Sequence, residues 1–141
     1  MRLVTKPLTY YIYPPMIRID KKLLIYKLPP ILFAGVILLL SSLPNAQAPS
    51  FDIRNIDKFY HGLEYFLFGI LIFRAFPHVH ASPRRVVFYV LLFVFGFVYA
   101  GLDETVQSFV PNRDSSIGDW LADIIGYTVA GVSVLLYRTR R

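Results

Sequence analysis

The chain has 141 residues, of which 55% are hydrophobic and only 17% charged, and it contains no Cys. A soluble domain usually carries about 25% charged residues mixed through the sequence, so this composition excludes an ordinary water-soluble fold, and the lack of Cys excludes a disulfide framework. Aromatic residues make up 16% of the chain, which excludes a disordered protein. The net charge of +6 would suggest nucleic acid as the partner of a soluble protein, so its meaning depends on where the charges fall.

Four apolar segments, separated by prolines, approach the length of a membrane crossing. A hydrocarbon core about 30 Å thick needs about 20 helical residues, and short loops place consecutive helices antiparallel. The sequence therefore predicts an all-α polytopic membrane protein, an antiparallel bundle of four transmembrane helices. We expect the helices at about 28–44, 57–76, 86–109 and 118–137, after a basic cytoplasmic or interfacial segment at 1–27 and before a basic cytoplasmic tail at 138–141.

The first and third segments are clear crossings, whereas the other two contain charged residues. The second carries His61 and Glu64, and the fourth carries Asp119 and Asp123. A soluble helical bundle is the alternative interpretation. We reject it because the stretch at 86–102 is apolar on every side and offers no face to water.

The basic residues gather on one side of the predicted bilayer. That side carries twelve of the fifteen basic residues beside a single acid, Asp20, and these basic residues are Arg2, Lys6, Arg18, Lys21, Lys22, Lys27, Arg74, Arg84, Arg85, Arg138, Arg140 and Arg141. The other side takes Arg54, Lys58 and Arg113 with the remaining eight acids. The positive-inside rule predicts that both termini are cytoplasmic. The positive charge then reflects topology and contact with anionic membrane lipids, and we expect no nucleic acid.

Polar side chains collect at the opposite, outward ends of the second, third and fourth helices. In the second helix, Asp57, His61 and Glu64 recur at helical spacing and share one stripe. An ionised side chain near the bilayer centre costs about 2.5 to 3.5 kcal/mol, so several together should face one another or a wet cavity. The candidate ligand-binding cluster consists of Asp57, Lys58, His61, Glu64, Asp103, Glu104, Gln107, Arg113, Asp119 and Asp123.

Several of these residues also have purely structural interpretations. Asp57 and Asp119 lie in the first turn of a helix, where a carboxylate stabilises the helix dipole, and Ser116 with Asp119 forms a capping-box pattern. Glu64 lies too deep to be a cap, so we favour a functional role there. Arg113 either pairs with a nearby acid or holds an anionic ligand through its planar guanidinium group.

These motifs together resemble the VanZ-like family of small bacterial membrane proteins. The resemblance covers about 28–136 and rests on Asp57-Lys58-x-x-His61, Asp103-Glu104-x-x-Gln107-x-Phe109-x-Pro111-x-Arg113, Ser116-x-x-Asp119-Trp120-x-Ala122 and Gly126. It implies a multi-pass protein of the bacterial plasma (inner) membrane, and the founding member is associated with resistance to the glycopeptide teicoplanin.

Two positions depart from the family pattern, which commonly has Gly at position 112 and Asn at position 123. Asn112 tolerates a left-handed turn, so the loop is expected to survive. Asp123 adds a possible negative charge to an acidic cluster, which can change what the cluster binds.

We expect a non-enzymatic protein whose polar cluster recognises a charged component of the cell envelope and contributes to glycopeptide resistance. The candidate ligands are a peptidoglycan precursor, a lipid head group or a glycopeptide, and no cofactor is expected. The alternative is an intramembrane metal-dependent hydrolase or transferase acting on a lipid-linked head group, with Glu64 or His61 as general base. No H-E-x-x-H, P-loop or nucleophile-elbow motif supports catalysis. Cation conduction ranks last, because the fourth helix has no charged residue between Asp123 and Arg138. The oligomeric state and the presence of a metal stay open.

Overall fold

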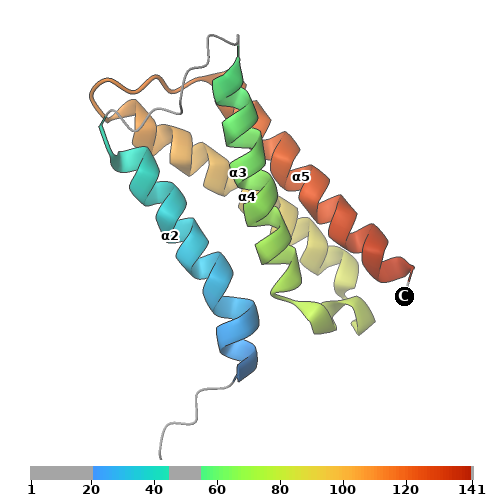
Figure 1. The fold of residues 1–141 in the computed structure, drawn as a ribbon. Helices are drawn as coiled ribbons and strands as arrows, with labels where there is room; N and C mark the ends of the chain where they lie inside the picture. The colour runs from blue at the N-terminus through green and yellow to red at the C-terminus, as the bar shows by residue number, and fades with distance from the viewer. Residues whose placement is uncertain (1–20, 45–54, 141) are drawn as a thin grey trace, which may run out of the picture.

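The computed structural model describes residues 21–44 and 55–140, which form four long helices and no strand. The helices are α2 (Leu28–Ser42), α3 (Ile56–Arg74), α4 (Arg85–Ser108) and α5 (Ile117–Thr139). Consecutive helices run in opposite directions, so α2 and α4 end, and α3 and α5 begin, at the same end of the bundle (Figure 1). The predicted all-α antiparallel bundle of four membrane helices is confirmed.

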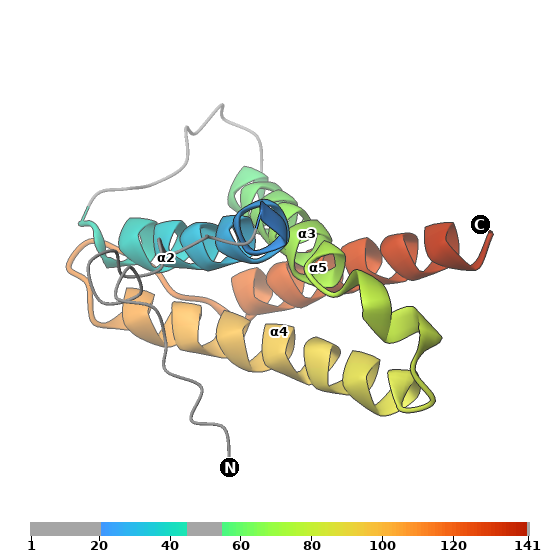
Figure 2. The same ribbon diagram turned by 90° about the horizontal axis from the view of Figure 1, so that it is seen from below.

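Three of the four helical segments are long and apolar enough on their own to cross a membrane, namely Leu23–Ser42, α4 and α5. Helix α3 does not meet that standard because Asp57, Lys58 and Glu64 lower its hydropathy. It packs along α5 over most of its length, so it crosses the same layer (Figures 1 and 2). Large apolar side chains such as Val86 are exposed on the outside of the bundle, where lipid would cover them.

The first helical stretch begins earlier than expected. A π-helical turn, Leu23–Lys27, leads without a break into α2, so the segment expected to precede the first crossing contributes its last residues to it. Pro29 and Pro30 at the start of α2 have no backbone N–H, so carbonyls of the preceding turn lose their usual partners and the turn widens. Residues 1–20 of the expected basic segment and Arg141 of the tail lie outside the described residues.

An aromatic core holds the middle of the bundle together. The rings of Phe68 and Phe73 in α3 lie 5.9 and 5.8 Å from the ring of Tyr127 in α5, and all three side chains are almost fully buried. The Tyr127 hydroxyl donates a hydrogen bond of 3.0 Å to the backbone carbonyl of Leu92 in α4. Tyr127 of α5 therefore contacts both α3 and α4.

The loop between α4 and α5 turns at Asn112, whose φ of 62° is left-handed. A left-handed residue without glycine is uncommon, and Asn is one of the side chains that tolerate it best. The expectation that Asn112 preserves this turn is confirmed. After this loop α5 packs along α3.

The other end of the bundle is basic and closed by Arg138. Its guanidinium donates to the backbone carbonyl of Phe73 at 2.9 Å, in the last turn of α3, and to that of Phe76 at 3.3 Å, just after the helix. The Lys27 ammonium lies 3.3 Å above the ring of Phe76. Helix α5 also continues to Thr139, two residues beyond the expected end of the fourth helix.

Candidate functional site

The polar residues meet where α2 and α4 end and α3 and α5 begin. We call this group the polar-end cluster, and its members are Ser41, Lys58, His61, Glu64, Asp103, Glu104, Gln107, Arg113, Ser116, Asp119 and Asp123. Four of its acids are buried, namely Asp103, Glu104, Asp119 and Asp123. Side chains that are far apart in the sequence thus share one buried, polar region.

His61 faces carboxylates from two other helices. Its Nδ1 lies 3.2 Å from Oδ1 of Asp123 in α5 and 4.0 Å from Oε1 of Glu104 in α4. The approach of α3 and α5 is possible because Gly62 and Gly126 pack backbone to backbone beside this pair. Asp123 therefore places a carboxylate directly against the imidazole.

Asp103 is held by a residue of α2. The Ser41 hydroxyl lies between two acceptors, Oδ1 of Asp103 and the backbone carbonyl oxygen of Ile37, and it donates its single hydrogen to one of them. The distance from the hydroxyl oxygen to the Ile37 carbonyl oxygen is 2.9 Å. The side-chain amide of Gln107 is 3.5 Å from the same hydroxyl oxygen. Tyr65 is a further buried neighbour of Asp103. Ser41 therefore ties α2 to the acidic end of α4.

Asp119 is the best-satisfied acid of the cluster. Ser116 caps α5 by accepting the Asp119 backbone N–H at 3.1 Å, and its hydroxyl donates to Oδ2 of Asp119 at 2.6 Å. The Lys58 ammonium lies 3.0 Å from Oδ1 of Asp119 and 3.0 Å from Oδ2 of Asp57. Asp57 is itself exposed, so it lies at the rim of the cluster and not inside it.

Glu104 connects the α4 end to the start of α5. Its Oε2 accepts the backbone N–H of Ser116 at 3.0 Å, while Oε1 turns toward His61. This bond satisfies an N–H group at the helix start that the capping side chain leaves unpaired. Only half of the predicted capping box forms: Ser116 accepts the Asp119 N–H, but Glu104 and not Asp119 accepts the Ser116 N–H.

Glu64 and Arg113 lie beside this core of the cluster. Glu64 is half-buried one turn below His61 and interacts electrostatically with Asp103, His61 and Arg113. Arg113 is half-buried in the α4–α5 loop and also interacts electrostatically with Asp103. The geometry therefore favours Arg113 as a partner of these acids.

Three buried carboxylate oxygens of the cluster have no hydrogen-bond partner, and they are Oδ2 of Asp103, Oε1 of Glu104 and Oδ2 of Asp123. Leaving such an acceptor unsatisfied in a buried site costs about 1 to 3 kcal/mol, and more if it is charged. His61, Asp103 and Asp123 offer ligand atoms that all lie within 4.8 Å of one another, and so do His61, Glu104 and Asp119. The cluster can therefore accept a positively charged group.

Ser41 was not predicted from the sequence as a member of the polar site. A serine in an apolar helix usually bonds the carbonyl four residues back, as Ser41 also does, so nothing in its local sequence marks it as part of a polar site. Its role follows only from the packing of α2 against α4. All other predicted residues except Asp57 lie in the cluster, and their assignment as binding residues stays a prediction.

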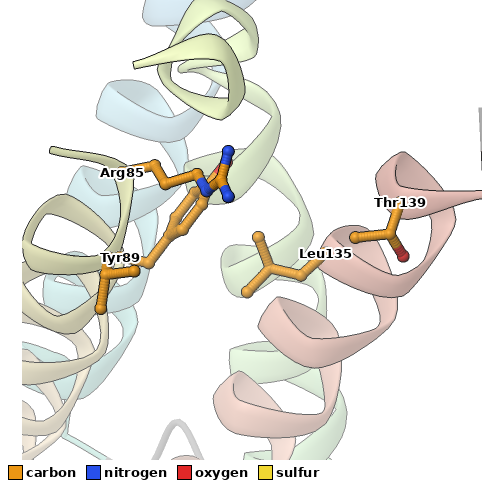
Figure 3. A pocket seen from close by; sticks show the side chains of 5 residues that line it. Arg85, Tyr89, Leu135 and Thr139 are labelled. Atoms are coloured by element: carbon orange, nitrogen blue, oxygen red, sulfur yellow. The ribbon is translucent and has the colours of Figure 1, made fainter. Parts of the chain in front are cut away.

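A cavity at the basic end has a different character. It has a volume of about 400 Å³ between α4 and α5 and is lined by Arg85, Val86, Tyr89, Leu135 and Thr139. Figure 3 shows the Arg85 side chain close to the Tyr89 ring, with Leu135 and Thr139 across from it. It contains no acid and shares no residue with the polar-end cluster, so we treat the two as separate features.

A family model described as VanZ/LLP1 matches residues 11–138, which is nearly the whole chain. The chain belongs to the VanZ/LLP1 family. All residues of the polar-end cluster lie inside the matched range in this VanZ/LLP1 protein. Neither a curated protein nor a solved structure matches the chain. The family therefore supports a membrane protein of this type, and its chemistry has to be argued from the cluster.

Proposed function

We propose that this VanZ/LLP1 protein recognises a charged component of the cell envelope through the polar-end cluster, at the outer face of the bacterial plasma membrane. The observation that supports it most is the set of three buried carboxylate oxygens without a partner around His61. A folded protein rarely keeps such groups unless something else contacts them. We infer that a positive charge supplies the missing contact.

The charges of the cluster support the same reading. Five carboxylates face at most three cations, which are Lys58, Arg113 and a protonated His61. Lys58 is already engaged by Asp57 and Asp119. The site therefore contains more acidic than basic groups.

The distribution of charge along the bundle supports the orientation. Among the described residues, Lys21, Lys22, Lys27, Arg74, Arg84, Arg85, Arg138 and Arg140 lie at the end opposite the cluster. The positive-inside rule makes this the cytoplasmic end, so the cluster faces outward and both termini lie inside. In this orientation the cluster meets peptidoglycan precursors, lipid head groups and glycopeptides.

A contribution to teicoplanin resistance is the biological role that we propose. The test is to express the wild-type chain and the variants His61→Ala, Glu64→Ala and Arg113→Ala in a susceptible host and to measure teicoplanin resistance. We expect each variant to lose the resistance gain at unchanged membrane abundance. Asp114→Ala is the matched control, because Asp114 is an exposed acid next to Arg113 and lies outside the cluster. Wild-type resistance in all three cluster variants would remove the cluster from the mechanism.

A hydrolase or transferase acting on a lipid-linked head group is the second candidate function. The contact between His61 and Asp123 supports it, since a carboxylate that orients an imidazole is a common arrangement for a general base. Incubation of the purified protein with a lipid-linked precursor separates the two functions. Release of the head group that His61→Ala abolishes would favour catalysis, and binding without release would favour recognition.

A further inference from the structure

We propose that the polar-end cluster holds a divalent first-row metal ion on His61, Asp103 and Asp123, with Glu104 beside it. The inference deepens the proposed function, on which its biological role rests, by naming the positive charge that the cluster takes up. With this ion bound, the cluster could recognise an anionic ligand, such as a phosphate head group. The ligands would come from α3, α4 and α5, so the ion would join three helices.

The donor atoms are close enough for one ion. Imidazole nitrogen and carboxylate oxygen lie about 2.0 to 2.2 Å from an ion such as Zn²⁺, so two ligands of one ion are at most about 4.4 Å apart. The ligand atoms of His61, Asp103 and Asp123 lie within 4.8 Å of one another. Three ligands of a tetrahedral ion lie about 3.3 to 3.6 Å apart, so shifts of up to about 1.5 Å by side-chain rotation would bring them into range.

A second observation points to a ligand independently of this spacing. Oδ2 of Asp103 and Oδ2 of Asp123 have no hydrogen-bond partner, although the two residues are only 1% and 0% exposed. Buried carboxylates of soluble and membrane proteins are usually paired or bound to metal. Coordination would satisfy both oxygens at once.

The cations already present do not satisfy these two oxygens. The Lys58 ammonium ion-pairs with Asp57 and Asp119, and His61 Nδ1 faces Oδ1 of Asp123 and not Oδ2. Arg113 interacts with Asp103 and Glu64, yet Oδ2 of Asp103 still lacks a hydrogen bond. A small divalent ion would supply the positive charge that these side chains do not bring to the two oxygens.

The donor set indicates which class of metal fits. Imidazole suits Zn²⁺, Fe²⁺ and similar ions, whereas a site for Mg²⁺ or Ca²⁺ normally consists of oxygens alone. One imidazole with two or three carboxylates is a mixed set, which favours a first-row transition ion such as Mn²⁺ or Zn²⁺. His61 decides this choice, and Asp123 adds a negative ligand that an amide at that position would not supply.

The test is metal binding by the full-length protein purified in detergent. After treatment with chelator, the protein is titrated with Mn²⁺ and followed by electron paramagnetic resonance, and with Zn²⁺ by calorimetry. We expect one ion per chain. Asp123→Asn and His61→Gln should each weaken metal binding by at least about tenfold, because even the loss of a group that only orients a metal ligand usually weakens binding by that factor. Asp57→Asn is the matched control and should bind normally, because Asp57 lies at the exposed rim.

Absence of a bound ion in the wild-type protein, or unchanged affinity in Asp123→Asn, would overturn the inference. A thermal unfolding measurement shows that Asp123→Asn is folded, and chelator should lower the unfolding temperature of the wild type but not that of Asp123→Asn. The failure of this inference and that of the proposed function are distinguishable. Metal binding without any effect of the cluster on teicoplanin would refute the proposed function alone, and cluster-dependent resistance without metal would refute the metal site alone.

Discussion

Gly126 of α5 lies directly against the backbone carbonyl of Gly62 in α3, so closely that a Cβ at position 126 would overlap the Gly62 oxygen. The contact is one residue along α3 from His61 and three along α5 from Asp123. It therefore sets the distance at which the imidazole and the carboxylate meet. A pair of residues without side chains thus determines the geometry of a polar site.

Gly126→Ala should destabilise the bundle, because the added methyl group must push α3 away from α5. Overpacking of this kind costs about 1 to 3 kcal/mol, and the obstacle here is backbone, which cannot rotate aside. Thermal unfolding of the purified protein in detergent measures the loss.

Gly35→Ala is the matched control for that substitution. Gly35 also lies within a helix, but a Cβ there meets no atom within 4 Å. Its replacement should leave stability unchanged or raise it by about 0.5 to 1 kcal/mol, since Ala favours helix over Gly. Equal losses in the two variants would show that close contact between α3 and α5 is not what Gly126 provides.

Ser41→Ala should destabilise the protein by about 1 to 3 kcal/mol, because it removes the hydroxyl beside a buried carboxylate of Asp103. Ser42→Ala, one residue along the same helix, removes an exposed hydroxyl that bonds only the Leu39 carbonyl, and it should have little effect. Unfolding of both variants in detergent provides the comparison. If Ser42→Ala were as damaging as Ser41→Ala, the link from α2 to α4 would not depend on the Asp103 contact.

Arg138→Ala should weaken the closure of the basic end. The variant would lose the two hydrogen bonds from the guanidinium to the carbonyls of Phe73 and Phe76. Each hydrogen bond to a charged group contributes about 1.5 to 3 kcal/mol to the free energy of unfolding, before water or lipid replaces part of it. Arg138→Lys should recover only part of this, because a single ammonium does not reproduce the planar fork. Exposed Arg140 supplies the control, and Arg140→Ala should unfold at the wild-type temperature.

The orientation in the membrane can be tested with single cysteines, because the chain has none of its own. Ser115→Cys, exposed in the α4–α5 loop, should react with a membrane-impermeant maleimide in intact cells. Thr139→Cys, exposed at the other end of α5, should react only after the membrane is permeabilised. The opposite pattern would place the polar-end cluster in the cytoplasm and refute outward recognition.

The sequence predicted which end of the bundle each polar residue occupies. Helix number, helix direction and loop length follow from apolar runs and prolines, and these fix the level of His61, Glu104 and Asp119 along the membrane normal. The limits of the four long helices agree with the expected ones to within two residues. The sequence did not predict the π-helical turn Leu23–Lys27, which precedes the two prolines and leads into α2.

The tertiary structure decided which polar residues touch. Helical spacing places Asp57 and His61 on one stripe, yet Asp57 is exposed at the rim, where Lys58 joins it to Asp119 of α5. The proximity of α3 to α5, and of α2 to α4, brings Asp123 to His61 and Ser41 to Asp103. Hydropathy fixes how deep a residue lies in the bilayer, whereas the rotation of each helix about its axis depends on how side chains interlock between helices that are distant in sequence.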